Sequence, residues 1–292
     1  MIEAFHIDKQ QVRQAFDKSA TRYDEAAVLQ REISDRLLER LEYIKYTPKR
    51  ILDVGAGTGY CTQALANQYG KAQIYAVDLA HNMLRQARSG VSLWQRLNKR
   101  FAYVTGDAEQ LPFADASVDM IISNLAIQWC NDLDQVFAEF RRILAPGGMV
   151  LFTTFGPDTL KELRSSWAAV DEVSHVNQFY DMHDIGDALL RHKFAEPVMD
   201  TEYLTMTYRD VMTLMKDLKQ IGAHNVTQGR SRQLTSRTQL KKMLNAYEQF
   251  RHDGLLPASY EVVYGHAWIA EEKSMSTQNS IDIPLTQITG QS

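Results

Sequence analysis

Asp53-Val54-Gly55-Ala56-Gly57-Thr58-Gly59 is the stretch of this sequence that decides its fold. The apolar residues 51–54 predict a short buried strand, and the residues after the glycines, to about 69, predict a helix. Glycines have no Cβ atom, so they let the backbone of a strand-to-helix turn lie very close to a ligand. The stretch therefore indicates an α/β sheet that binds a small molecule at the end of a strand.

The glycine spacing separates this turn from two turns that bind phosphate groups. A dinucleotide-binding turn has the pattern G-x-G-x-x-G, but here Tyr60 stands where the third glycine belongs. No Gly-Lys-Ser/Thr of a phosphate-binding loop follows either. A dehydrogenase therefore stays a weak alternative, and so does a glycine-rich turn that binds nothing.

Strands and helices alternate along the chain, which predicts a mainly parallel sheet with helices on both faces. The first 45 residues are predicted as helix, up to the break at Thr47-Pro48. The predicted strands are 51–54, 73–77, 101–104, 118–123, 149–155, 198–206 and 260–269. Further predicted helices are 83–88, 133–144 (stopped by Pro146-Gly147-Gly148), 160–170, 185–190, 211–221 and 238–250.

With 292 residues the chain is longer than a typical domain and shorter than two. We expect one domain over 1–270, with a helical lid at 1–46, a ligand-binding core at 47–155, and further helices and the last strands at 156–270. The polar, aperiodic tail 271–292 is predicted to be disordered.

Composition and charge exclude several classes of function. The net charge is −4, which argues against nucleic acid as the main partner. No stretch approaches 18 apolar residues and the N-terminus has no apolar core, so we expect no membrane span and a cytoplasmic location. The two cysteines, Cys61 and Cys130, have neither C-x-x-C spacing nor a histidine cluster nearby, so no metal site is expected.

Three polar residues follow other predicted strands. Asp78 ends the second strand, 21 residues after Gly57, where an acid can bind both hydroxyls of a ribose. Asp107 follows the third strand, where it can accept a hydrogen bond from an adenine amino group, and Asn124 ends the fourth. A single acid after a strand is more often a plain cap. Four such strand ends at one edge of a parallel sheet indicate one binding crevice.

This arrangement resembles the class I S-adenosylmethionine-dependent methyltransferases, whose motifs match 53–59, Asp78, Asp107 and Asn124 in turn. The resemblance implies a Rossmann-like fold and S-adenosylmethionine as methyl donor, with Asn124 near its methionine portion. The cofactor-binding residues that it implies are Asp53, Gly55, Gly57, Gly59, Asp78, Leu79, Asp107, Ala108 and Asn124.

Stretches outside the core narrow the resemblance to the malonyl-acyl-carrier-protein O-methyltransferases of biotin synthesis, over about residues 5–270. The stretches similar to that family are 16–20 with Tyr23-Asp24, 123–130, 152–155, 162–164 with Trp167, 169–172, 175–179, 218–225, 229–230 and 234–235. A respiratory-complex assembly hydroxylase on the same fold shares features around 156–160, and it stays an alternative. A methyltransferase acting on a quinone or another carboxylic acid is a second one.

A malonyl carboxylate is already ionised at pH 7, so its methylation needs no general base. It needs a cation that holds it in a dry pocket, and a bidentate arginine does this best. Arg230 is the first candidate. We expect Tyr23 to close over the cofactor or touch the carboxylate, and Trp129 to form a wall of the acceptor pocket. The alternatives are a surface charge for Arg230 and core aromatics for the other two. His175 is a weaker candidate, because a lone histidine is more often structural.

A basic segment offers a surface for the acyl carrier protein that the resemblance implies as partner. It carries a net charge of +6 and contains Lys216, Lys219, Arg230, Arg232, Arg237, Lys241 and Lys242 with one acid, Asp217. Acyl carrier proteins are strongly acidic as a class. A solvated helix face without a partner is the alternative.

Overall fold

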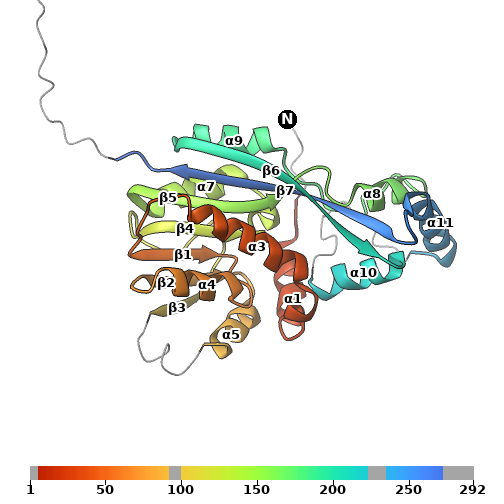
Figure 1. The fold of residues 1–292 in the computed structure, drawn as a ribbon, viewed down its shortest axis with the longest axis horizontal. Coiled ribbons are helices and arrows are strands. Elements are labelled where there is room, and N and C mark those ends of the chain that lie inside the picture. The colour runs from red at the N-terminus through yellow and green to blue at the C-terminus, as the bar shows by residue number, and fades with distance from the viewer. Residues whose placement is uncertain (1–5, 92–99, 223–234, 272–292) are drawn as a thin grey trace, which may run out of the picture.

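The structure, a computed structural model, describes residues 6–91, 100–222 and 235–271. Its centre is a seven-stranded sheet with the strand order β3-β2-β1-β4-β5-β7-β6 (Figure 1). Only β7 runs against its neighbours, so the predicted mainly parallel sheet is confirmed. The strands are β1 (Arg50–Val54), β2 (Gln73–Asp78), β3 (Phe101–Thr105), β4 (Val118–Asn124), β5 (Leu144–Phe155), β6 (Ala195–Tyr208) and β7 (Leu256–Trp268).

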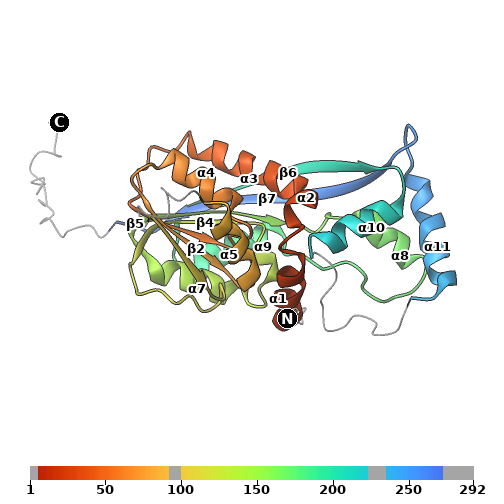
Figure 2. The same ribbon diagram turned by 90° about the horizontal axis from the view of Figure 1, so that it is seen from below.

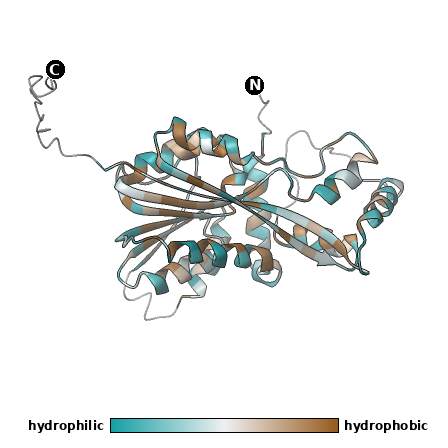
Figure 3. Cartoon of the chain, turned by 45° about the horizontal axis from the view of Figure 1, so that its top comes forward, coloured by the Kyte–Doolittle hydropathy of each residue, from teal (hydrophilic) through white to brown (hydrophobic). Residues whose placement is uncertain are grey.

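Helices cover both faces of the sheet. The helices α3 (Val28–Leu41), α4 (Tyr60–Gln68) and α5 (His81–Ser89) pack on one face, and α7 (Leu133–Ile143) and α9 (Met182–Arg191) pack on the other. Strand β4 shows why the middle of its sequence is apolar. Met120 and Ile122 belong to the core on the first face, while Ile121 belongs to the core on the second. Figure 3 shows the same distribution, with hydrophobic residues along the strands and mixed polarity on the helices.

Residues 6–45 form three helices, so the prediction of one helix is wrong. They are α1 (Lys9–Ser19), α2 (Tyr23–Ala26) and α3. The side chain of Asp8 caps α1 by accepting from the backbone N–H of Gln11. Helix α1 packs on α5, whereas α3 packs on α4 and the sheet. One straight helix cannot reach both surfaces, and the chain turns between them.

Strand β5 begins earlier than predicted. Helix α7 ends at Ile143, and Pro146-Gly147-Gly148 lies inside β5 instead of in a loop before it. Gly147 has a φ of +73°, and the pairing of β4 with β5 shifts register between Val118 and Met120. The glycines therefore make an irregularity within a strand rather than its boundary.

Strands β6 and β7 run beyond the rest of the sheet and carry a second group of helices (Figures 1 and 2). This group consists of α8 (Lys161–Ala168), α10 (Val211–Gln220) and α11 (Arg237–Tyr247). Both views place α1 between the sheet and these outer helices. Among the described helices, none combines the length and the apolar character needed to cross a membrane.

Candidate active site

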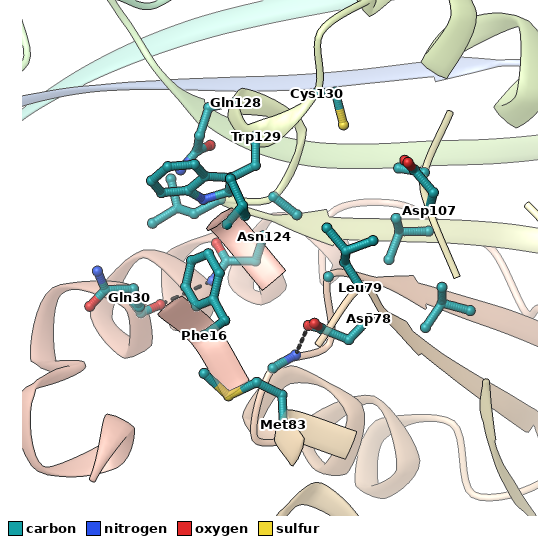
Figure 4. Close-up of a pocket in the computed structure, with 18 of the residues that line it drawn as sticks. Phe16, Gln30, Asp78, Leu79, Met83, Asp107, Asn124, Gln128, Trp129 and Cys130 are labelled. Carbon is teal, nitrogen blue, oxygen red and sulfur yellow. Dashed lines mark hydrogen bonds between the residues drawn. The ribbon is translucent and has the colours of Figure 1, made fainter. Parts of the chain in front are cut away.

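The ends of four parallel strands border one hollow, which we call the strand-end pocket (Figure 4). Residues following β1, β2, β3 and β4 line it, together with side chains of α1 and α2. Nine of the predicted site residues lie on its wall: Tyr23, Gly55, Gly57, Asp78, Leu79, Asp107, Ala108, Asn124 and Trp129. The structure therefore brings together most of what the sequence pattern selected.

The three glycines of the turn have different surroundings. All have a positive φ, between +54° at Gly57 and +86° at Gly59. A Cβ on Gly55 would lie 2.1 Å from the Cβ of Ala126, and one on Gly59 would lie 2.8 Å from the Cβ of Ala87. A Cβ on Gly57 would meet nothing within 4 Å. Gly55 and Gly59 therefore serve close packing, while Gly57 borders open space in the pocket.

Asp78, at the end of β2, connects the glycine turn to the start of α5 through two hydrogen bonds. One carboxylate oxygen accepts from the backbone N–H of Gly57 at 2.9 Å (Figure 4). The other accepts from the N–H of Ala80 at 2.8 Å. The two hydrogen bonds lower the pKa of this carboxyl, but burial has the larger effect and raises it to about 6. Each oxygen keeps a lone pair for a ligand.

Asp53 and Gly59 lie behind the strand-end pocket rather than on its wall. Asp53 is fully buried and accepts a hydrogen bond from the hydroxyl of Thr62 in α4. Burial raises the pKa of Asp53 to about 7. Asp53 thus joins β1 to the helix after the glycine turn, and it faces a smaller recess beside the main pocket.

Asp107 is held by a residue that the sequence did not single out. The ammonium of Lys9, at the start of α1, lies 2.6 and 2.7 Å from the two carboxylate oxygens of Asp107. It lies 2.7 Å from Glu109 as well. Burial alone lowers the pKa of Lys9, but these two acids raise it overall. No local signal marks Lys9, because its partners lie about 100 residues away.

Asn124 connects the strand end to its neighbours. Its side-chain oxygen accepts from the hydroxyl of Thr153 at 2.7 Å. Its side-chain nitrogen donates to the backbone carbonyl of Gln30 at 3.1 Å (Figure 4). These bonds join β4, β5 and α3 at one side of the pocket. Asn124 is thereby fixed in orientation.

A second hollow, which we call the outer cavity, lies between the strand-end pocket and the outer helices. Its wall is formed by α1, α8, α10 and the segment 175–179. Four residues line both hollows: Gln30, Trp129, Phe155 and Ile221. Trp129 packs edge-on against Phe16, with 5.4 Å between the ring centres. The two hollows therefore meet at a junction of mainly apolar side chains.

Similarity to known proteins decides what kind of site this is. Residues 52–152 match the family model of a methyltransferase domain. The chain is 53% identical to a malonyl-[acyl-carrier protein] O-methyltransferase of Nitrosospira multiformis, over 90% of this chain and 89% of that one. A protein with the same name from Gallionella capsiferriformans is 54% identical, over 90% and 92%. The chain belongs to the malonyl-[acyl-carrier protein] O-methyltransferase family.

The fold agrees with this family. A putative methyltransferase of Bacillus halodurans superposes with a TM-score of 0.57, over 81% of this chain and 98% of that structure, at 18% identity. At that identity the likeness concerns the fold alone. The class I methyltransferase fold predicted from the glycine turn and the three strand ends after it is confirmed, and the chain is a methyltransferase.

Two further predictions for the acceptor side of this methyltransferase have different outcomes. Arg230 lies outside the described residues. His175 lies on the wall of the outer cavity, stacked on Trp167 with ring centres 3.8 Å apart, and one ring nitrogen is 2.8 Å from Asp171. The stack fixes the ring against the wall.

The described part of the basic segment lies on two helices. Lys216 and Lys219 of α10 line the outer cavity, whereas Lys241 and Lys242 of α11 do not. Arg230 and Arg232 lie outside the described part of the chain. Within that part, no group of three or more His, Cys, Asp or Glu side chains is arranged to hold a metal ion.

Proposed function

We propose that this methyltransferase moves a methyl group from S-adenosylmethionine to the free carboxylate of a malonyl group carried by an acyl carrier protein. The observation that carries the proposal is the junction at Gln30, Trp129 and Phe155, where a pocket for the methyl donor meets a cavity for the acceptor. The names of the curated relatives support the choice of acceptor. The product is a malonyl methyl ester that primes pimeloyl synthesis for biotin.

The strand-end pocket fits S-adenosylmethionine. Asp78 has a free lone pair on each oxygen for the two ribose hydroxyls, and the space beside Gly57 admits a ligand against the backbone. Asp107 and Ala108 border the place for the adenine, and Leu79 lines the same wall. Asn124 is assigned to the methionine portion, Gly55 to the close turn, and Asp53 and Gly59 to its support. When bound, this donor supplies an electrophilic methyl group on a sulfonium.

The residues around the junction position the acceptor and exclude water. The attacking carboxylate is ionised at neutral pH, so no proton has to be removed from it. Placing the carboxylate oxygen in line with the methyl group is therefore the main task of the protein. Tyr23 and Trp129 are proposed to wall this place, and Arg230 to hold the carboxylate. Burial and the nearby acids Asp78 and Asp24 raise the pKa of the Tyr23 phenol, so Tyr23 stays neutral there.

Esterification removes the charge of the malonyl group. Enzymes of fatty-acid synthesis with apolar pockets can then extend the product as they extend an ordinary uncharged primer. We place this reaction in the cytoplasm and assign it neither a metal, a nucleic acid nor a membrane. The two cysteines, Cys61 and Cys130, are both buried free thiols, as suits a reducing compartment.

The test is a reconstituted reaction with S-adenosylmethionine and either malonyl-acyl carrier protein, malonyl-coenzyme A or free malonate. Mass spectrometry should find the methyl ester on the malonyl group, with the highest kcat/KM for the carrier-bound substrate. The gene should also restore growth of a biotin-requiring bacterial strain that lacks this methyltransferase. A folded protein that binds S-adenosylmethionine but forms no ester on any malonyl thioester would favour another acceptor or an assembly function.

A further inference from the structure

Four exposed cations surround the outer cavity. Lys18 and Arg22 come from the end of α1 and the turn after it, and Lys216 and Lys219 come from α10. The two pairs are about 200 residues apart in the chain. Packing nevertheless brings their elements together, because a Cβ on Gly222, just after α10, would lie 3.3 Å from the hydroxyl of Ser19. We call these four side chains the cavity rim.

One acid, Glu25, lines the same cavity as the four cations of the rim, so these five side chains together carry a net charge of +3. In the described part of the chain, none of the four cations forms an ion pair, whereas Arg36, Arg50 and Arg142 each do. Two acids are close by in the fold. Glu25 accepts from Gln220, and Asp217 interacts with Tyr208. The rim therefore presents unpaired positive charge around an opening.

The wall inside the cavity rim has a different character. Leu160, Leu163, Trp167, Phe179 and Leu218 give it an apolar surface. Such a surface suits an uncharged, flexible arm better than a free anion. A charged ring around an apolar cavity matches a ligand with two parts, an acidic body that stays outside and an arm that enters.

We propose that the cavity rim, Lys18, Arg22, Lys216 and Lys219, is the docking surface for the acidic face of the acyl carrier protein. The proposal rests on the proposed function, since it concerns the partner of the same cavity. Docking there directs the thioester arm along the apolar wall towards Trp129 at the junction. Exposed complementary charges of this kind speed the encounter of two proteins and orient them.

This surface differs from the one that the sequence indicates. Lys241 and Lys242 have the same charge and belong to the same basic segment, but α11 carries them away from the cavity wall. Lys18 and Arg22 take their place and come from the opposite end of the chain. The two sets make a matched comparison.

The experiment compares charge-reversed pairs: Lys18→Glu with Arg22→Glu, Lys216→Glu with Lys219→Glu, and the control Lys241→Glu with Lys242→Glu. Each is assayed on malonyl-acyl carrier protein and on malonyl-pantetheine, which has the arm without the protein. Both rim pairs should lose about tenfold or more in kcat/KM on the carrier substrate, mainly in KM, and should lose less of their activity when salt is added. Rates on malonyl-pantetheine and affinity for S-adenosylmethionine should match the wild type.

A second set of variants covers the case in which a reversed pair misfolds. It replaces the same residues by neutral ones: Lys18→Gln with Arg22→Gln, and Lys216→Gln with Lys219→Gln. Thermal melting measures whether every variant is folded. Smaller losses confined to the carrier substrate support the docking surface. Equal losses on both substrates, or an equal loss in the α11 control pair, overturn it. Failure of the proposed function looks different, because the wild type then methylates neither malonyl substrate.

Discussion

At the scale of single residues, Gly55 and Gly57 share a left-handed backbone but face different neighbours. Replacing either by alanine costs about 1–2 kcal/mol of backbone strain. In Gly55→Ala the new Cβ also meets Ala126 at 2.1 Å, so the fold must shift. In Gly57→Ala it enters only the space assigned to the methyl donor. We expect Gly57→Ala to lose at least tenfold in affinity for S-adenosylmethionine with a smaller drop in thermal stability than Gly55→Ala.

Calorimetric titration and thermal melting of the two variants measure these effects separately. Their shared backbone strain cancels in the comparison, which isolates the contact of each new methyl group. Gly57→Ala that binds the donor as tightly as the wild type would place the ligand elsewhere.

Asp78 makes donor binding depend on pH. Its pKa in the free protein is about 6, so at pH 5 most of this carboxyl is protonated. Ribose hydroxyls donate best to the ionised form, so affinity should rise as pH increases through 6 and level off above 7. At pH 5, one unit below the pKa, only about a tenth of the carboxyl is ionised. Affinity should therefore rise roughly tenfold between pH 5 and pH 8.

The matched variant is Asp78→Asn. It keeps the size of the side chain but cannot ionise, so its affinity should be nearly independent of pH over this range. At pH 8 it should be weaker than the wild type by about 1.5–3 kcal/mol. Calorimetry at four pH values compares the two proteins, and a wild-type affinity that stays flat would mean that Asp78 does not hold the ribose.

The residues of the strand ends were predictable, whereas those facing them were not. Gly57, Asp78, Asp107 and Asn124 follow strands that the apolar pattern marks, and parallel strands of one sheet place their ends together. Lys9 reaches the same pocket only because α1 folds back over it. The function of Lys9 therefore depends on long-range packing, which has no signature in the sequence around it.

At the scale of elements, α1 closes one side of the strand-end pocket and is fastened at its start. The side chain of Asn131 accepts from the backbone N–H of Ile7 at 2.6 Å and donates to its carbonyl at 3.1 Å. Lys9 adds the bonds to Asp107 and Glu109, so the entry to α1 is anchored at two points. Periodicity could not reveal this arrangement, because the apolar spacing continues across the breaks between α1, α2 and α3.

Lys9→Met should loosen α1. Removing the ammonium of Lys9 leaves the carboxylates of Asp107 and Glu109 without their cation. The free energy of unfolding should fall by about 1–2 kcal/mol, between the values for exposed and buried ion pairs. Hydrogen exchange of residues 7–19 should become faster, and S-adenosylmethionine should dissociate sooner. Arg13→Met is the control. Arg13 lies on the same helix, and within the described ranges its one ion pair is a long one, with Asp17 at 3.8 Å. Equal exchange in both variants would exclude a fastening role for Lys9.

At the scale of the whole molecule, the loop after β5 crosses β7 beside the outer cavity, at a place that we call the crossing point. There the loop after β5 is hydrogen-bonded to Glu261 of β7. The backbone N–H of Asp158 donates to the Glu261 carboxylate at 2.7 Å, and the N–H of Gly156 donates to the Glu261 carbonyl at 2.9 Å. The sequence predicted strands on both sides of this point. It could not show that β6 and β7 extend past the sheet to carry α8, α10 and α11, because strand length does not reveal which helices a strand supports.

Gly156→Ala tests this crossing point. A Cβ at Gly156 would lie 2.4 Å from the carboxyl carbon of Glu261, so the glutamate must move and give up its bond to Asp158. Overpacking of this kind costs about 1–3 kcal/mol in stability. Phe155, Thr159 and Leu160 lie on the wall of the outer cavity, so the acceptor shifts relative to the methyl donor.

We therefore expect kcat/KM for malonyl-acyl carrier protein to fall roughly ten- to hundredfold, as small misplacements do. Affinity for S-adenosylmethionine should change little, because the crossing point lies outside the glycine turn and Asp78. The control is Gly186→Ala in α9, where the nearest atom to a new Cβ is the Met199 side chain at 3.8 Å, an ordinary contact. Kinetics and calorimetry on both variants separate the two hollows. If Gly156→Ala weakens donor binding as much as turnover, the loop supports the whole site and not the acceptor side in particular.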